Sequence, residues 1–108
     1  MKLSILKILN DSTNAVFHDD GLAVYNKMLP SVKQNKEVEL SFEGIKICTT
    51  QFLNACVGKL LMEFGSEHVK KHIHPTQYAE IHAFSEKYSL VFSNFEEKNR
   101  GAIEEAYD

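Results

Sequence analysis

Alternating apolar and polar residues predict the strands in the first half of the chain. The clearest case is residues 38–42, in which valine, leucine and phenylalanine alternate with glutamate and serine, the two-residue period of a half-buried strand. Ile45 and Ile47 continue this alternation toward two threonines. Residues 2–9 are rich in Ile and Leu and precede a turn-forming run, so we expect a strand there and a short second strand at residues 15–17.

Spacings of three and four residues predict the helices. Apolar residues recur on one side of residues 19–32 behind an acidic pair that suits the first turn of a helix, and Pro30 should kink or end this helix. From Thr50 the two-residue period gives way to a wide helical stripe that continues to Phe64. Thr49 or Thr50 is then the N-cap of that helix.

The second half of the chain is predicted to continue this alternation of helices and strands. A short helix over residues 66–73 should end at His74-Pro75, because the residue before proline avoids the helical region. We expect a helix over residues 76–87 and a last strand at residues 89–93, with Asn94 as the cap of a terminal helix. That terminal helix would carry Phe95, Ala102, Ile103 and Ala106. The pattern indicates an α/β fold with a small mixed sheet and helices packed against it.

Length and charge narrow the class of protein. A chain of 108 residues with 44% hydrophobic and 25% charged residues suits one globular domain over residues 1–108. The net charge of −3 gives no positive field, so we expect neither nucleic acid nor a membrane surface as partner. No signal-peptide core or long apolar run is visible, and we expect a cytoplasmic protein. Cys48 and Cys56 have no metal-site or disulfide spacing and are expected to be reduced core thiols.

Two neighbouring hydroxyls at Thr49 and Thr50 are the most specific feature of the sequence. One hydroxyl suffices to cap a helix by accepting a hydrogen bond from an amide of its first turn. A strand-to-helix corner also exposes a hydroxyl beside free amides, where an added phosphate would be accommodated. Residues alone leave both readings open, capping and a phosphorylation switch.

The surrounding sequence resembles the STAS-like family of small bacterial proteins. The resemblance covers residues from about 15 to 72, with a weaker match at Asp20-Gly21 and Tyr25-Asn26. The central motif is an alternating strand, a Phe-Glu-Gly turn, small hydroxyl residues, and then Phe-x-Asn with a glycine four residues later. Its positions here are Phe42, Glu43, Gly44, Thr49, Thr50, Phe52, Asn54 and Gly58.

The resemblance implies a regulatory module that binds a protein partner without catalysis or cofactor. STAS domains occur in sulfate transporters and in anti-sigma-factor antagonists, where a partner kinase phosphorylates a serine at the matching corner. That serine position falls on Gln51 here, and a shift of one residue would place it on Thr50. The implied contact surface is Thr49, Thr50, Gln51, Asn54 and Gly58, and the implied partner class is a histidine-kinase-type ATPase.

Other classes of function rest on weaker patterns. His68, His72 and His74 are spaced by four and two residues, and the first two would share a helix face, which offers two ligands for a metal-binding protein or small metal enzyme. The lysines between them disfavour a cation. No phosphate-binding glycine loop or catalytic constellation is visible in the sequence. A homodimer formed through an exposed helix face is the third alternative.

Overall fold

The computed structural model describes the backbone of residues 1–107 and the side chains of residues 1–95. Within them, β1 (Lys2–Ser4), β3 (Val38–Ser41) and β5 (Ile73–Thr76) form one sheet in the order β1-β3-β5, and β2 (Asn14–Ala15) pairs with β4 (Ile47–Cys48). All of these described pairings are parallel. The predicted α/β class is therefore confirmed, while the predicted mixed sheet is corrected to parallel pairing.

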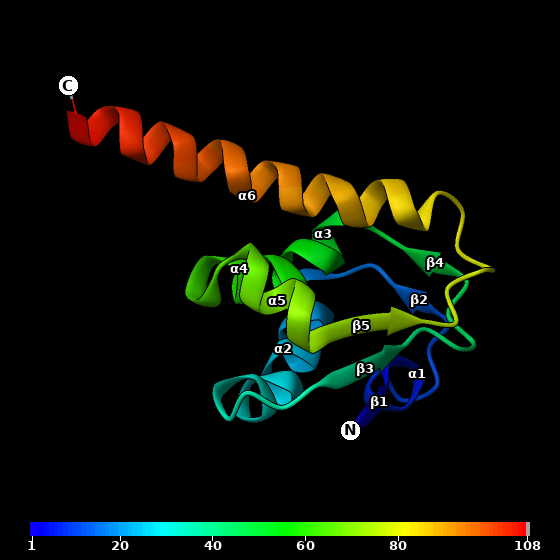
Figure 1. The fold of residues 1–108 in the computed structure, drawn as a ribbon. Helices are drawn as coiled ribbons and strands as arrows, with labels where there is room; N and C mark the ends of the chain where they lie inside the picture. Colours follow the sequence, from blue (N-terminus) through cyan, green and yellow to red (C-terminus); the bar gives the residue numbers. More distant parts are fainter. Residues whose placement is uncertain (108) are drawn as a thin grey trace.

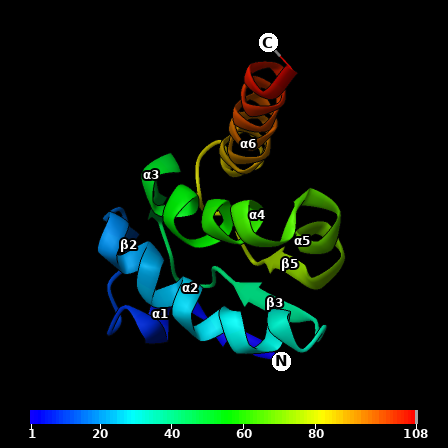
Figure 2. The ribbon, with the colours of Figure 1, turned by 90° about the vertical axis from the view of Figure 1, so that its left-hand side faces the viewer.

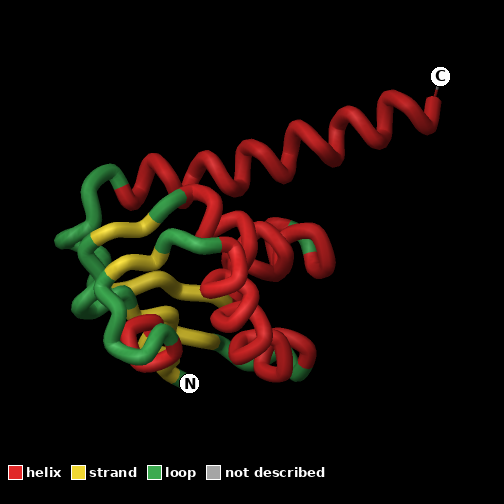
Figure 3. Tube along the Cα trace, turned by 180° about the vertical axis from the view of Figure 1, so that it is seen from behind, coloured by secondary structure: helices red, strands yellow, loops and turns green. Residues whose placement is uncertain are grey.

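Helices follow or separate the strands, as the alternation predicted. They are α1 (Ile5–Ile8), α2 (His18–Lys33), α3 (Thr50–Leu53), the π-helical segment η1 (Asn54–Gly58), α4 (Lys59–Phe64), α5 (Ser66–His72) and α6 (Phe84–Tyr107). The last and longest helix, α6, runs along α3, η1 and α4, and its C-terminal end projects beyond the rest of the molecule (Figures 1 and 2). The strands lie side by side when seen from behind (Figure 3).

One hydrophobic cluster joins both sheets to the helices. The alternation of β3 places Val38, Leu40 and Phe42 in this cluster with no exposed surface. Directly after Phe42 the chain turns at Gly44, whose φ of +84° is easily reached only by glycine. This turn returns Ile45 to the core, so the predicted Phe-Glu-Gly turn is confirmed.

Parallel pairing of β2 with β4 sets the position of the candidate site. The two strands run in the same direction, with Ala15 opposite Cys48. Each strand is followed within a few residues by a helix, α2 after β2 and α3 after β4. The N-termini of α2 and α3 therefore lie side by side at one edge of the fold.

Two predictions in the first half of the chain were wrong in extent. The strand predicted for residues 2–9 ends at Ser4, because the Ser4 hydroxyl accepts a hydrogen bond from the Lys7 amide (3.3 Å) and caps α1. Of the two outcomes predicted for Pro30, a kink or an end of the helix, the end is wrong, because α2 continues to Lys33.

The prediction was wrong over most of residues 73–95. Residues 73–76 form strand β5, in which Pro75 is tolerated because β5 has β3 as its one sheet partner within the described residues. The predicted helix over residues 76–87 is instead a loop that contains Gln77 and Ala83 at φ of +55°, and α6 begins only at Phe84. The predicted strand at 89–93 and the predicted cap Asn94 both lie inside α6.

The aromatic residues of helix α6 lie on one face of the helix. The strand prediction overlooked the three- and four-residue spacing that places them there. Phe84, Val91 and Phe92 are buried, and Tyr88 and Phe95 pack against the same core. The predicted apolar residues Ala102, Ile103 and Ala106 lie outside the residues whose side chains are described. Among the helices of residues 1–107, none combines the length and apolar character needed to cross a bilayer.

Candidate functional site

Thr49 fixes the corner between β4 and α3. Its hydroxyl accepts a hydrogen bond from the Phe52 amide (3.2 Å) and donates one to the Val16 carbonyl (2.8 Å). Its own amide donates to the Ala15 carbonyl (3.0 Å). The prediction of an N-cap is confirmed for Thr49, which also ties the start of α3 to the end of β2.

Thr50 and Gln51 lie in the first turn of the helix that Thr49 caps. Thr50 is partly exposed, and within the described residues its hydroxyl has no hydrogen-bond partner. Gln51 is exposed. Since Thr49 already satisfies the cap, these two side chains are not needed for the turn and are presented to solvent.

The helix that begins at Thr50 continues as one rod to Phe64, with a π-helical segment in its middle. This segment, η1, begins at Asn54 and ends at Gly58. Wide helical turns of this kind are rare and often occur at functional sites. Asn54 is exposed, and Gly58 is partly covered. The sequence predicted a helix here but not its change of pitch.

Gly58 faces helix α6. A Cβ atom at this position would meet Val91 Cγ1 at 3.5 Å, an ordinary van der Waals separation. Gly58 therefore lies beside α6 at a separation that would also accommodate a methyl group. Part of the face that carries Asn54 and Gly58 is occupied by α6 itself.

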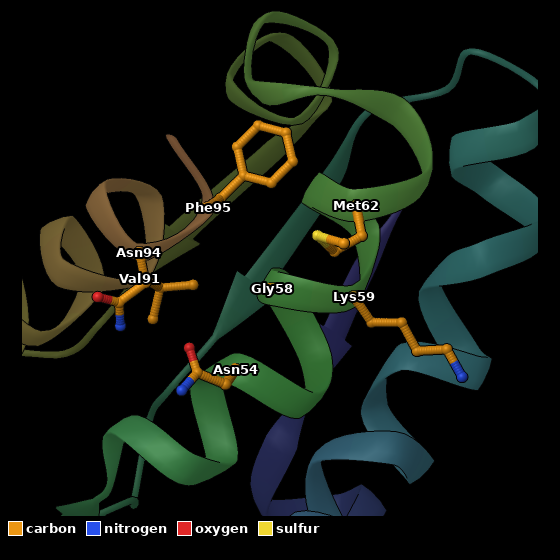
Figure 4. A pocket seen from close by; sticks show the side chains of 7 residues that line it. All are labelled: Asn54, Gly58, Lys59, Met62, Val91, Asn94 and Phe95. Atoms are coloured by element: carbon orange, nitrogen blue, oxygen red, sulfur yellow. The ribbon is translucent and has the colours of Figure 1, made fainter. Parts of the chain in front are cut away.

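A small hollow lies between this face and α6 (Figure 4). Its volume is about 180 Å³, and its lining consists of Asn54, Gly58, Lys59, Met62, Val91, Asn94 and Phe95. Pockets for small organic ligands typically reach about 300–1,000 Å³. The hollow is thus small for a substrate and adds a mixed amide and apolar surface beside the corner.

The resemblance at Asp20-Gly21 and Tyr25-Asn26 has a structural basis. A Cβ atom on Gly21 would lie 2.5 Å from the Phe52 carbonyl oxygen and 2.6 Å from Ala55 Cβ, so α2 touches α3 and η1 there with no room for a side chain. Tyr25 is buried and donates its hydroxyl hydrogen bond to Glu63 on α4. Burial, together with this carboxylate, raises the pKa of the Tyr25 phenol to about 12.

Both cysteines are buried free thiols, as predicted. Burial raises the pKa of Cys48 to about 12 even though the Lys87 ammonium opposes this shift, and burial also raises the pKa of Cys56. The Lys87 ammonium donates a hydrogen bond to the Cys48 carbonyl (2.9 Å), which fastens α6 to the end of β4. Neither thiol has the exposed, thiolate-favouring setting of a nucleophile.

The three histidines are held by different partners. The His72 Nδ1 donates to the His68 carbonyl (2.8 Å), and the two rings lie 4.2 Å apart between centroids, with Phe64 stacked on His68. His74 instead contacts Glu37 Oε1 at 2.9 Å. Among the described residues, no group of three or more His, Cys, Asp or Glu side chains is arranged to hold a metal ion. The spacing that suggested a metal site therefore does not bring the three imidazoles together.

Helix α6 supplies residues of this surface that the sequence prediction missed. Val91, Asn94 and Phe95 line the hollow, whereas residues 89–93 were predicted as a strand. The signal was present in the spacing of Phe84, Tyr88, Val91 and Phe95, which places all four on one helix face.

Comparison with known proteins identifies a family for most of the chain. The profile of a family described as a STAS-like domain of unknown function (DUF4325) matches residues 20–81, which include most of α2, the corner and β5. Searches of curated proteins and of solved structures gave no match. Since the matched segment is more than half of the chain, this protein belongs to the STAS-like domain family.

Proposed function

We propose that this domain is a non-enzymatic regulatory module that binds a protein partner through the surface around Thr50, Gln51 and Asn54. The observation that carries the proposal is that the residues at the corner have different roles. Thr49 makes the hydrogen bonds that hold the turn, while Thr50, Gln51 and Asn54 are presented on a rigid helix start. Polar side chains without a structural task on a fixed scaffold are suited to recognition.

The chemistry around the corner also favours binding over catalysis. The two nearby thiols are buried and have raised pKa values, and the adjoining hollow holds only about 180 Å³. A partner protein needs neither a nucleophile nor a deep pocket. The family resemblance makes a histidine-kinase-type ATPase the first partner to test.

The test is affinity capture from extracts of the source cells with quantitative mass spectrometry. We compare the wild type with Gln51→Arg and with the matched control Gln34→Arg. Gln34 is exposed at the C-terminal end of α2, about 24 Å from the N-terminus of that helix by its 1.5 Å rise per residue. One protein should be recovered by the wild type and by Gln34→Arg, and lost with Gln51→Arg. Equal recovery by all three would refute partner binding at the corner.

A switch at Thr50 is the second part of the proposal. Thr49 is committed to two hydrogen bonds, so Thr50 is the threonine that offers a hydroxyl to a kinase. A phosphate there would sit at the start of a helix, where negative charge is tolerated by the fold. It would add about 1.5–2 negative charges to the contact surface without unfolding the turn.

The switch predicts different effects for two substitutions of similar size. Thr50→Glu should weaken binding of the captured partner roughly tenfold or more, equal to about 1.4 kcal/mol, while Thr50→Gln should change it little. Isothermal titration calorimetry measures both, and circular dichroism checks that both variants fold. Equal affinities for Thr50→Glu and Thr50→Gln would remove charge at Thr50 as the switch while leaving partner binding intact.

A further inference from the structure

Phe17 occupies an unusual place at the start of helix α2. It is the N-cap residue, with φ of −87° and ψ of 149°, and its side chain makes no capping hydrogen bond. Its ring is also 69% exposed, the highest value among the large apolar residues described. Phe17 therefore neither caps the helix nor contributes a buried ring to the core.

Both features disfavour phenylalanine on grounds of stability. Serine, threonine, aspartate or asparagine at an N-cap stabilises a helix relative to an apolar residue. An exposed phenyl ring gains nothing from hydrophobic burial. Positions where a residue breaks the local rules without a structural gain are frequently functional, and exposed aromatic rings are frequent anchors of protein interfaces.

The backbone places Phe17 beside the threonine corner. The Val16 carbonyl, one residue before Phe17, accepts the Thr49 hydroxyl hydrogen bond at 2.8 Å. One turn later, Gly21 lies against the Phe52 carbonyl. The start of α2, which carries the exposed Phe17, therefore adjoins the start of α3, which carries Thr50 and Gln51.

We propose that Phe17 is the apolar anchor of this surface, and that its partner is a protein with a phenyl-sized apolar pocket and a basic rim. This inference rests on the proposed function of the corner. The basic rim follows from the first turn of α2, where Asp19 has a side chain 99% exposed and is followed by a second carboxylate, Asp20. Opposite charge on the partner would steer and orient the complex.

A second copy of this chain fits the surface less well. A two-fold dimer places the same patch of both copies together, so it would bring two sets of Asp19 and Asp20 into contact and cost energy by like-charge repulsion. Among the residues whose side chains are described, Phe17 and Ile47 are the large, exposed apolar residues beside β2 and β4, which is little for a stable dimer interface that buries about 1,200–2,000 Å². A single ring that enters a pocket of another protein requires neither contact between like charges nor a large apolar interface.

The test begins with a crosslinker on the corner. Full-length protein with Gln51→p-benzoylphenylalanine is irradiated in extract of the source cells, and the crosslinked protein is identified and purified. The Kd of that protein is then measured for the wild type, Phe17→Ser, Asp19→Lys and the control Gln34→Ser. Gln34 is exposed, as Phe17 is, and lies at the C-terminal end of α2, whereas Phe17 caps its N-terminus.

We expect Phe17→Ser to raise the Kd roughly 30-fold, as for an interface hot spot, and Gln34→Ser to leave it within about threefold. Asp19→Lys should slow association, most strongly at low salt. Because serine is a good N-cap, Phe17→Ser should also raise the Tm. A weaker complex from a more stable protein cannot be explained by unfolding.

Each other outcome overturns a defined part of the inference. If Phe17→Ser binds as tightly as the wild type while Gln51→Arg does not bind, the anchor is wrong and the proposed function stands. If the crosslinked protein is this chain itself, the surface is a dimer interface and the heterologous partner is wrong. If no protein is crosslinked from position 51 and affinity capture with the wild type recovers none either, the proposed function fails, and the anchor fails with it.

Discussion

A single hydroxyl at Thr49 connects three segments of the chain. It accepts from the first turn of α3 and donates to the residue that follows β2, so capping and tertiary attachment depend on the same atom. Thr50, its neighbour with the same side chain, has no such bond within the described residues. The corner therefore separates a structural threonine from one that is available to a partner.

This separation predicts different effects of the same substitution. Thr49→Val keeps the shape but leaves the Phe52 amide and the Val16 carbonyl without their partner, and should lower the free energy of unfolding by about 1–2 kcal/mol. Thr50→Val should change it by less than about 0.5 kcal/mol. Urea unfolding followed by circular dichroism measures both. Equal losses would mean that Thr50 also holds the turn.

At the scale of the elements, two glycines on different helices have opposite tasks. Gly21 lets α2 touch η1 with no space for a methyl group, while Gly58 leaves ordinary van der Waals space to α6. Both lie in helical segments, where glycine costs up to about 1 kcal/mol relative to alanine. Only the packing of Gly21 requires that cost.

The contrast is tested by the same change at both sites. Gly21→Ala should destabilise the domain by about 1–3 kcal/mol because α2 must move away from the Phe52 carbonyl. Gly58→Ala should be neutral or stabilising by up to about 1 kcal/mol, since the added methyl only touches Val91. Thermal unfolding of the two variants beside the wild type decides the matter. A large loss for Gly58→Ala would show that the π-helical turn itself requires glycine.

Patterns among residues that are neighbours in sequence were enough to predict the elements around the corner. The alternation in β3, the turn at Gly44 and the cap at Thr49 each depend on neighbouring residues only, and all three were predicted correctly. Strand β5 was missed because Pro75 was read as an end of structure, whereas its tolerance depends on lying at a sheet edge. The short run at 89–93 looked like a strand because periodicity alone does not distinguish a strand from a buried helical segment over so few residues.

The candidate site was predictable in part for the same reason. Thr49, Thr50, Gln51 and Asn54 lie close together in sequence, so the resemblance to the STAS-like family implied them as a contact surface, which stays a prediction. Val91, Asn94 and Phe95 reach the surface only because α6 packs across η1, which is a long-range contact. Phe17 is near the corner because β2 and β4 are parallel neighbours, and no local pattern contains that information.

For the whole molecule, buried groups with raised pKa values determine how stability changes in alkali. The pKa of Cys48 rises from 9.0 to about 12, and that of Tyr25 from 10.0 to about 12. Burial likewise raises the pKa of Cys56 and Tyr88. At a pH between the ordinary and the raised pKa of each group, the unfolded chain loses a proton that the folded chain retains. Rising pH therefore favours unfolding.

We expect these groups to make their full contribution to the free energy of unfolding below about pH 9. This contribution should fall steadily between about pH 9 and 12. Urea unfolding at intervals across this range measures the slope. Cys48→Ala should show a shallower slope than the wild type, because one of the retained protons is gone, whatever its stability at neutral pH. A free energy of unfolding that stays constant from pH 8 to pH 11 would contradict this account.

Strand β5 forms an edge of its sheet within the described residues, and Pro75 stands in the middle of it. The Thr76 carbonyl accepts from the Phe42 amide (2.9 Å), so by alternation His74 and Thr76 turn their backbone groups toward β3 and Pro75 turns outward. Proline carries no amide hydrogen, and the outer rim therefore lacks a donor where an added strand would need one. This interruption should protect the domain from edge-to-edge aggregation when it is concentrated or newly synthesised.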